Sequence, residues 1–104
     1  MILELTNDKK PKSKTSKETL DLFRDLFLKN KDCYIYGYTI ELLTHKKGVR
    51  KFINLLRWEG MPIISNYNGY KYSTNKEEIK ECYEKLRIRA LRTYSAAKKM
   101  KMNL

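Results

Sequence analysis

Polar side chains suited to reading nucleic acid cluster in the middle of the chain: Arg50, Lys51, Asn54 and Arg57. An arginine guanidinium matches the O6 and N7 acceptors of guanine, an asparagine amide can bond adenine bidentately, and a lysine ammonium pairs best with phosphate. Arg50 lies four residues before Asn54 and seven before Arg57, so these three side chains share one face of a helix. The spacing predicts DNA base contacts from Arg50 and Asn54, with Arg57 beside them on the same face.

The helix that must carry this face is predicted over residues 46–58. Its apolar residues recur at i, i+3, i+4 and i+7, which indicates a stripe packed on a core: Val49, Phe52, Ile53 and Leu56. Three lysines border the polar face and are predicted to contact the DNA backbone: Lys46, Lys47 and Lys51. Trp58 would end the helix and cap the core. The alternative is an ordinary solvated helix face, which charged residues usually form.

A β-hairpin is predicted directly after this helix, over residues 61–73. Asn68 and Gly69 supply the positive φ angles of a primed turn, and they stand between two runs of apolar and aromatic residues. Strand alternation would place Lys71 on the opposite face from its tyrosine neighbours. Tyr67 falls at the tip, where packing alone does not account for an aromatic side chain.

This part of the chain resembles the recognition helix and wing of small winged helix-turn-helix DNA-binding proteins of the bacteriophage and prophage type. The resemblance runs from about Tyr36 to Glu78 and rests on this pattern: Val49-Arg50-Lys51-Phe52-Ile53-Asn54-x-x-Arg57-x-x-Gly60-x-Pro62-Ile63-x-Ser65-x-x-x-Gly69-Tyr70. It implies that residues 46–58 enter the major groove of double-stranded DNA, and that residues 61–73 lie on the flanking backbone or minor groove. Tyr67 and Lys71 then become backbone contacts of the wing. The turn from Thr44 to Gly48 departs from the small-residue turn of that family.

Three further elements precede this helix and hairpin in the predicted fold, an α+β arrangement that is mainly α with a small β-hairpin. A first helix begins at Thr15 or Ser16, where Thr15-x-x-Glu18 fits a capping box. Residues 33–36 are β-branched and aromatic, which indicates a short strand pairing with the hairpin. A helix over residues 38–44 then packs on the recognition helix through its apolar residues Ile40, Leu42 and Leu43.

A long helix is predicted over residues 76–101, capped by Asn75-x-x-Glu78. At 1.5 Å per residue it would reach ~39 Å, and its apolar stripe continues beyond what so small a domain can cover. The second half therefore pairs with a second copy, docks on another protein, or frays. We favour a homodimer, because two-fold DNA sites need two recognition helices about 34 Å apart. The predicted dimerisation residues are Leu86, Ala90, Tyr94 and Ala97.

The charge distribution indicates a polyanionic partner. The 104 residues include 23 Lys and Arg against 12 Asp and Glu, which gives a net charge of +11. Residues 15–43 carry a net charge of −1, whereas residues 44–60 carry +4 and residues 85–104 carry +7. Mere solubility would not segregate the charge in this way. Residues 1–14 are interpreted as a flexible basic arm, which either follows a DNA minor groove or is a solvated tail.

No pattern in the sequence indicates an enzyme, a cofactor or a metal site. There is no Gly-rich phosphate loop, and Glu77 and Glu78 fit a solvated helix face. Cys33 and Cys82 lie far apart and His45 is the one histidine, so neither zinc ligation nor a disulfide framework is expected. Free thiols suit a reducing cytosol, and no apolar run approaches the length of a membrane span. We expect a cytoplasmic protein of a bacterial host cell, associated with the nucleoid.

Together these patterns predict a winged helix-turn-helix domain over residues 15–75, followed by the long helix of residues 76–104. The leading hypothesis is sequence-specific binding of double-stranded DNA by a phage or mobile-element transcriptional regulator. One alternative is a DNA-binding accessory factor in phage replication or packaging. Another is a protein-interaction module, in which the winged fold or the long helix binds a host protein.

Overall fold

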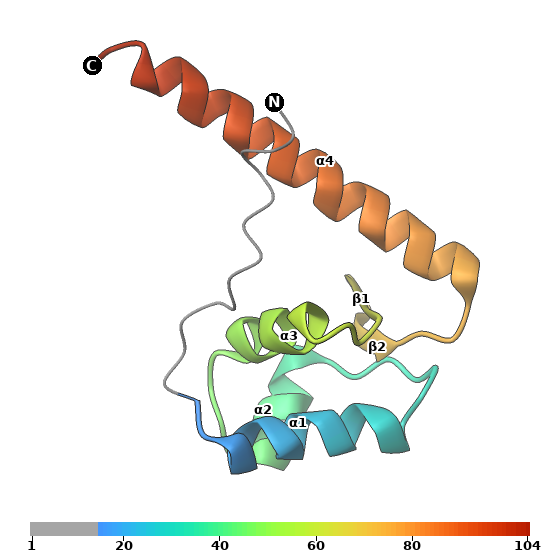
Figure 1. Cartoon of the computed structure of the whole chain (residues 1–104). Coiled ribbons are helices and arrows are strands. Elements are labelled where there is room, and N and C mark those ends of the chain that lie inside the picture. The colour runs from blue at the N-terminus through green and yellow to red at the C-terminus, as the bar shows by residue number, and fades with distance from the viewer. Residues whose placement is uncertain (1–14) are drawn as a thin grey trace.

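The computed structural model describes residues 15–104, which form helices around one small antiparallel hairpin (Figure 1). The helices are α1 (Lys17–Lys29), α2 (Gly37–Thr44), α3 (Val49–Trp58) and α4 (Lys76–Lys101), and the strands are β1 (Ile63–Asn66) and β2 (Gly69–Tyr72). This composition confirms the predicted α+β class, mainly helical with a small hairpin. The predicted basic arm, residues 1–14, lies outside the described residues.

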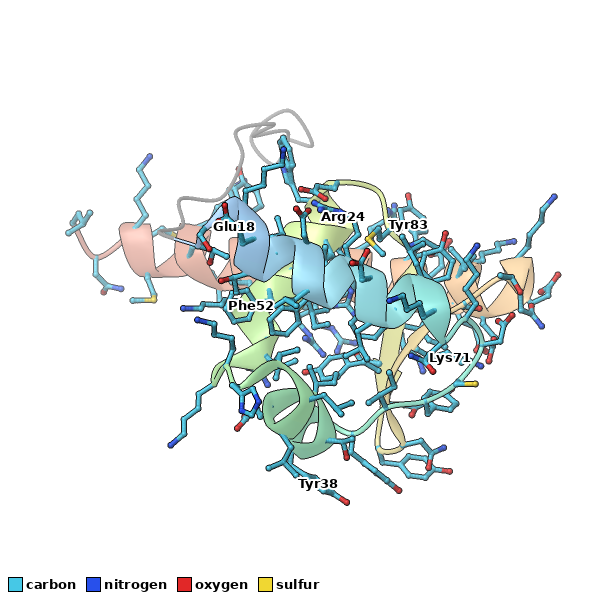
Figure 2. The ribbon with its side chains drawn as sticks, turned by 90° about the horizontal axis from the view of Figure 1, so that it is seen from below. Glu18, Arg24, Tyr38, Phe52, Lys71 and Tyr83 are labelled. Carbon is cyan, nitrogen blue, oxygen red and sulfur yellow. The ribbon has the colours of Figure 1, made fainter. Side chains whose placement is uncertain are left out.

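Helix α1 packs on α3 and supplies much of the core. Its N-cap is Ser16, one of the two predicted starts, rather than Thr15 of the predicted capping box. Ser16 accepts a hydrogen bond from the backbone N–H of Thr19 at 3.2 Å. The buried residues of α1 share one side of the helix: Leu20, Phe23 and Phe27. Phe23 stacks on Phe52 of α3 with ring centroids 4.3 Å apart, and Figure 2 shows Phe52 beneath α1. This aromatic contact holds the two helices together.

Helix α3 has the predicted apolar stripe but a later start. It begins at Val49 rather than Lys46, because His45 and Gly48 adopt left-handed conformations with φ of 58° and 75°. Its buried residues are Val49, Phe52, Ile53, Leu55 and Leu56. The stripe predicted from helical spacing is therefore confirmed, with Leu55 added to it.

Helix α2 contacts the core through a narrower face than predicted. Ile40 is fully buried, and one turn later the hydroxyl of Thr44 donates a hydrogen bond to the Ile40 carbonyl oxygen at 2.7 Å. Leu42 and Leu43, both predicted to pack on α3, are 70% and 61% exposed. The line from Ile40 to Thr44 defines the inward side of this short helix, which turns Leu42 to the opposite side. Trp58 ends α3 as predicted, but it is 47% exposed and is not among the residues packed against the core.

The hairpin is fastened to the chain segment before α2. Strands β1 and β2 pair antiparallel up to Asn66 and Gly69, which flank a tight turn. The strand predicted at residues 33–36 is reduced to a single bridge, in which Ile35 and Tyr70 exchange backbone hydrogen bonds of 2.8 and 2.9 Å. A Cβ atom on Gly69 would lie 2.4 Å from the Ile35 carbonyl oxygen, so only glycine fits this crossing.

Helix α4 crosses the molecule on the side of α3 that faces away from α1 and α2 (Figures 1 and 2). It begins where predicted, with the Asn75 side chain accepting hydrogen bonds from the N–H groups of Glu77 and Glu78. It contacts β1 near its first turns and diverges from the other helices towards its C-terminal end (Figure 1). No residue of α4 is buried. Most of this helix therefore offers its surface to solvent or to a partner.

Candidate nucleic-acid interface

The outward face of α3 carries side chains predicted to read DNA. Arg50, Lys51 and Asn54 are exposed, while the opposite side of the same helix forms the core. An ion pair fastens the C-terminal end of α3 to α1, with Arg24 Nη2 lying 2.6 Å from Glu59 Oε1. The helix is thus held at both its apolar face and its end. The Arg50 guanidinium and the Asn54 amide extend into solvent from this fixed helix.

Arg57 lies further along the same helix, but its guanidinium is engaged with the hairpin. Its Nε donates a hydrogen bond to the Ile63 carbonyl oxygen at 2.7 Å, and its Nη2 donates to Ser65 Oγ at 3.1 Å. A guanidinium that reads guanine needs its fork free for the O6 and N7 acceptors. The predicted base contact from Arg57 therefore does not fit this structure, in which the side chain joins α3 to β1.

Lys71 is buried, which does not fit its predicted contact with the DNA backbone. Its ammonium donates a hydrogen bond to Glu78 Oε2 at 2.9 Å and lies 4.5 Å from the centroid of the Tyr34 ring. The hydrogen bond that Lys71 donates to Glu78 raises the pKa of Lys71. The same bond, together with one donated by the Ser73 hydroxyl, lowers the pKa of Glu78. Strand alternation separated Lys71 from the neighbouring tyrosines, but it could not show that the first turn of α4 would cover that face.

The other predicted backbone contacts are exposed. Lys46 and Lys47 lie in the loop before α3 rather than in its first turn. The Lys51 ammonium lies 5.0 Å from the centroid of the Phe52 ring, at the edge of the outward face. Tyr67 occupies the hairpin turn and is 91% exposed. Cations therefore gather at the N-terminal end of α3, and an aromatic side chain marks the end of the hairpin.

Helix α4 adds cations that the sequence analysis did not assign to the interface. Lys85 and Arg89 line a hollow of about 160 Å³ together with Arg57. The carboxylates of Glu78 and Glu81 also line it, so its charge is mixed. The only sequence signal was the net positive charge of the last residues, which does not reveal which side of α4 faces the hairpin. The structure brings Lys85 and Arg89 to the same hollow as Arg57.

An apolar groove of about 360 Å³ lies between the hairpin and the first half of α4. Its apolar lining includes Met61, Pro62, Ile64, Ile79, Tyr83 and Leu86. Among the predicted dimerisation residues, Leu86, Ala90 and Ala97 are exposed and Tyr94 is half-buried. The ammonium of Lys98 lies 5.6 Å from the centroid of the Tyr94 ring. The groove and the rest of the apolar stripe form surfaces on which an apolar partner could pack.

Within residues 15–104, no cluster of side chains is arranged to hold a metal ion. Cys33 and Cys82 are free thiols. The helices of this range include none with the length and apolar character needed to cross a bilayer. His45 is exposed at the end of α2, where its positive φ helps to form the turn into α3.

Comparison of the chain with known protein families, with curated proteins and with solved structures found no match. The interpretation of this surface therefore depends on its geometry and charge.

Proposed function

We propose that the protein binds double-stranded DNA in a sequence-specific manner, with α3 in the major groove, and acts as a transcriptional regulator of a phage or mobile element. The observation that carries this proposal is the division of α3 into two sides. One side forms the core of the domain, and the other extends Arg50 and Asn54 freely into solvent. Those side chains are suited to guanine and adenine edges in the major groove.

The order of the elements supports a winged helix-turn-helix arrangement. A helix, a single-bridge strand, two further helices joined by a short turn, and a hairpin follow one another along the chain. In such an arrangement the second helix of the turn motif reads the groove and the hairpin lies beside it. The short turn between α2 and α3, and the attachment of the hairpin to α3 through Arg57, are consistent with this role.

Selection of bound fragments from random DNA, followed by binding measurements on single variants, tests the proposal. Arg50→Ala or Asn54→Ala should cost about 1–3 kcal/mol of binding free energy on the selected sequence and much less on unrelated DNA. Lys51→Ala should weaken binding to both. Lys29→Ala, which removes an exposed charge from the end of α1, is the matched control. Equal losses on every sequence for Arg50→Ala and Asn54→Ala would contradict base reading.

We further propose that α4 pairs with α4 of a second copy, which would present two α3 helices to a two-fold site. Its support is the length of α4 combined with the absence of any buried residue along it. Ala90→Glu and Ala97→Glu would place charges within the paired surface. Each should shift the protein from dimer to monomer in sedimentation measurements while the helical content stays unchanged. A wild-type protein that is monomeric at high concentration would contradict the pairing.

The apolar groove between the hairpin and α4 favours a second candidate, a module that binds another protein. Leu86→Glu would place a carboxylate in this groove, at a position that is already partly exposed. If protein binding is the function, the partner should be lost from Leu86→Glu and retained by Arg50→Ala and Asn54→Ala. An accessory role in replication or packaging would use the same DNA contacts as a regulator, and the location of the selected sites would distinguish the two.

A further inference from the structure

Four tyrosines gather around the hairpin turn, and none of them belongs to the core: Tyr34, Tyr36, Tyr38 and Tyr67. Tyr36 is 50% exposed, Tyr38 65% and Tyr67 91%. A folded protein usually buries most of an aromatic ring, because each ring contributes a large apolar area. Three rings so widely exposed in one neighbourhood are therefore not explained by packing.

The backbone brings these residues together. Ile35 pairs with Tyr70, and the adjacent Gly69 approaches Tyr36 so closely that a Cβ on the glycine would lie 3.0 Å from the Tyr36 Cα. On the other side of the turn, the Asn66 side chain donates a hydrogen bond to the Tyr34 hydroxyl at 2.8 Å. The segment before α2 therefore places tyrosines on both sides of the hairpin turn that carries Tyr67.

The exposed rings are already arranged for stacking. The rings of Tyr36 and Tyr38 stack on each other, with centroids 5.6 Å apart and planes inclined by 15°. Figure 2 shows Tyr38 extending outward from α2, on the side of the molecule to which the hairpin turn also points. We call Tyr36, Tyr38 and Tyr67 the tyrosine surface.

The charge next to the tyrosine surface matches a polyanion. Tyr38 lines a shallow surface hollow together with Lys46 and Lys47, and the carboxylate of Glu41 and the imidazole of His45 also lie there. The lysines outnumber the single carboxylate. This surface thus combines rings for stacking with cations for phosphates, which is the pairing used by proteins that bind unpaired nucleotides.

We propose that the tyrosine surface binds unpaired bases of DNA, next to the duplex that α3 holds. The proposal builds on the proposed function and extends its substrate to DNA with a single-stranded segment. Each base would stack on a tyrosine ring, and its phosphate would pair with Lys46 or Lys47. Stacking of this kind tolerates any base, because every base has a π face. Sequence reading stays with α3, whereas the tyrosine surface recognises that the strands are separated.

The test compares three labelled DNAs by fluorescence anisotropy: a blunt duplex with the selected site, the same duplex with an unpaired tail at either end, and the tail strand alone. The tailed duplex should bind more tightly than the blunt one. Tyr38→Ala and Tyr67→Ala should each reduce that advantage by roughly tenfold. Tyr38→Ala should leave blunt-duplex binding unchanged, whereas Tyr67→Ala should also weaken it slightly, because Tyr67 is a predicted contact of the wing with the duplex backbone. Tyr67→Phe should retain the advantage, because the ring rather than the hydroxyl makes the contact. Tyr83→Ala removes a tyrosine of α4 that is 58% exposed, close to the 65% of Tyr38, and is the matched control for Tyr38→Ala.

The outcomes separate this proposal from the proposed function. Tight duplex binding with no gain from either tail would overturn the role of the tyrosine surface and leave the role of α3 intact. If the double variant Tyr38→Ala, Tyr67→Ala still bound the tailed duplex more tightly than the blunt one by the wild-type factor, the role of the tyrosine surface would also be overturned. Loss in Tyr67→Phe as large as in Tyr67→Ala would assign the contact to the hydroxyl and refute stacking. Binding of the tail strand alone, lost in the alanine variants, would support the tyrosine surface even if α3 bound no duplex.

Discussion

At the scale of single residues, side chains on one helix face have different roles. Arg50 and Arg57 lie two turns apart on α3, yet Arg50 is exposed and Arg57 bonds to the backbone of β1. The face itself could be derived from helical spacing. The engagement of Arg57 could not, because it depends on where β1 returns past the end of α3. The same holds for Lys71. Its partner Glu78 belongs to α4, and the sequence around Lys71 does not show that α4 packs against β2 there.

The Lys71–Glu78 pair gives a prediction about pH. The pKa of Glu78 is lowered in the folded protein, so its contribution to stability is present above its ordinary value of 4.5 and is lost as pH falls through the lowered value. The pKa of Lys71 is raised, so its contribution to stability is fully present below its ordinary value of 10.5. That contribution is lost only as pH rises through the raised value. Glu78→Gln should therefore lower the melting temperature at neutral pH, and the gap to wild type should close in strong acid.

Thermal unfolding followed by circular dichroism across the acid range measures this gap. Glu77→Gln is the matched control, since it removes the same charge from the same turn of α4 without touching Lys71. The pKa of Asp32 is also lowered, by hydrogen bonds from the Thr74 hydroxyl and N–H. Asp32 is present in the wild type and in both variants, so its contribution to the pH dependence of stability cancels in the comparison. A gap that stays constant from neutral pH into strong acid would contradict the assignment.

At the scale of elements, the segments with strong local signals were predicted well. The Asn-Gly turn, the apolar stripe of α3 and the start of α4 follow from turn chemistry, helical spacing and an asparagine cap. The start of α3 was predicted three residues early, because nothing local requires His45 to adopt a positive φ. The packing of α2 was also misjudged. Leu42 and Leu43 are apolar, but the short helix directs only one narrow line of residues inward.

Two glycines give a matched test of how the hairpin is fastened. Gly60 and Gly69 both have positive φ, at 97° and 109°, but an added Cβ meets nothing within 4 Å at Gly60 and lies 2.4 Å from a backbone oxygen at Gly69. Gly60→Ala should therefore cost only the conformational strain, about 1 kcal/mol of unfolding free energy. Gly69→Ala should cost clearly more, about 2–4 kcal/mol, because the bridge to Ile35 must also shift. Urea denaturation compares the two, and equal costs would show that the crossing is not close-packed.

At the scale of the whole molecule, the protein consists of a small packed body and one long helix that extends from it. The body holds all the buried apolar residues within the described part of the chain, and α4 contributes none of them. The positive charge is divided in the same way, between α3 with its preceding loop and the second half of α4. The positive charge therefore lies on two elements of the described chain that diverge from each other (Figure 1).

Removal of residues 90–104 should leave the body intact. The residues of α4 that line the groove against the hairpin end at Arg87, so a chain ending at residue 89 keeps them all. Its unfolding free energy should stay within about 1 kcal/mol of the full chain, because none of the α4 residues removed is buried. The same variant should no longer self-associate. Denaturation and sedimentation measure the two effects, and a large loss of stability would show that the distal helix packs on the body.

The loop that joins β2 to α4 sets the direction of the entire helix. Ser73 is buried there and donates a hydrogen bond to Glu78 at 3.0 Å, while Thr74 is held by Asp32. A helix of 26 residues acts as a lever about 39 Å long, so a swing of about 10° at this pivot displaces its far end by about 7 Å. Small changes in three loop residues would thus be amplified into the spacing between two joined protomers. In the proposed dimer, the separation between the two α3 helices would thereby be set by residues far from either helix.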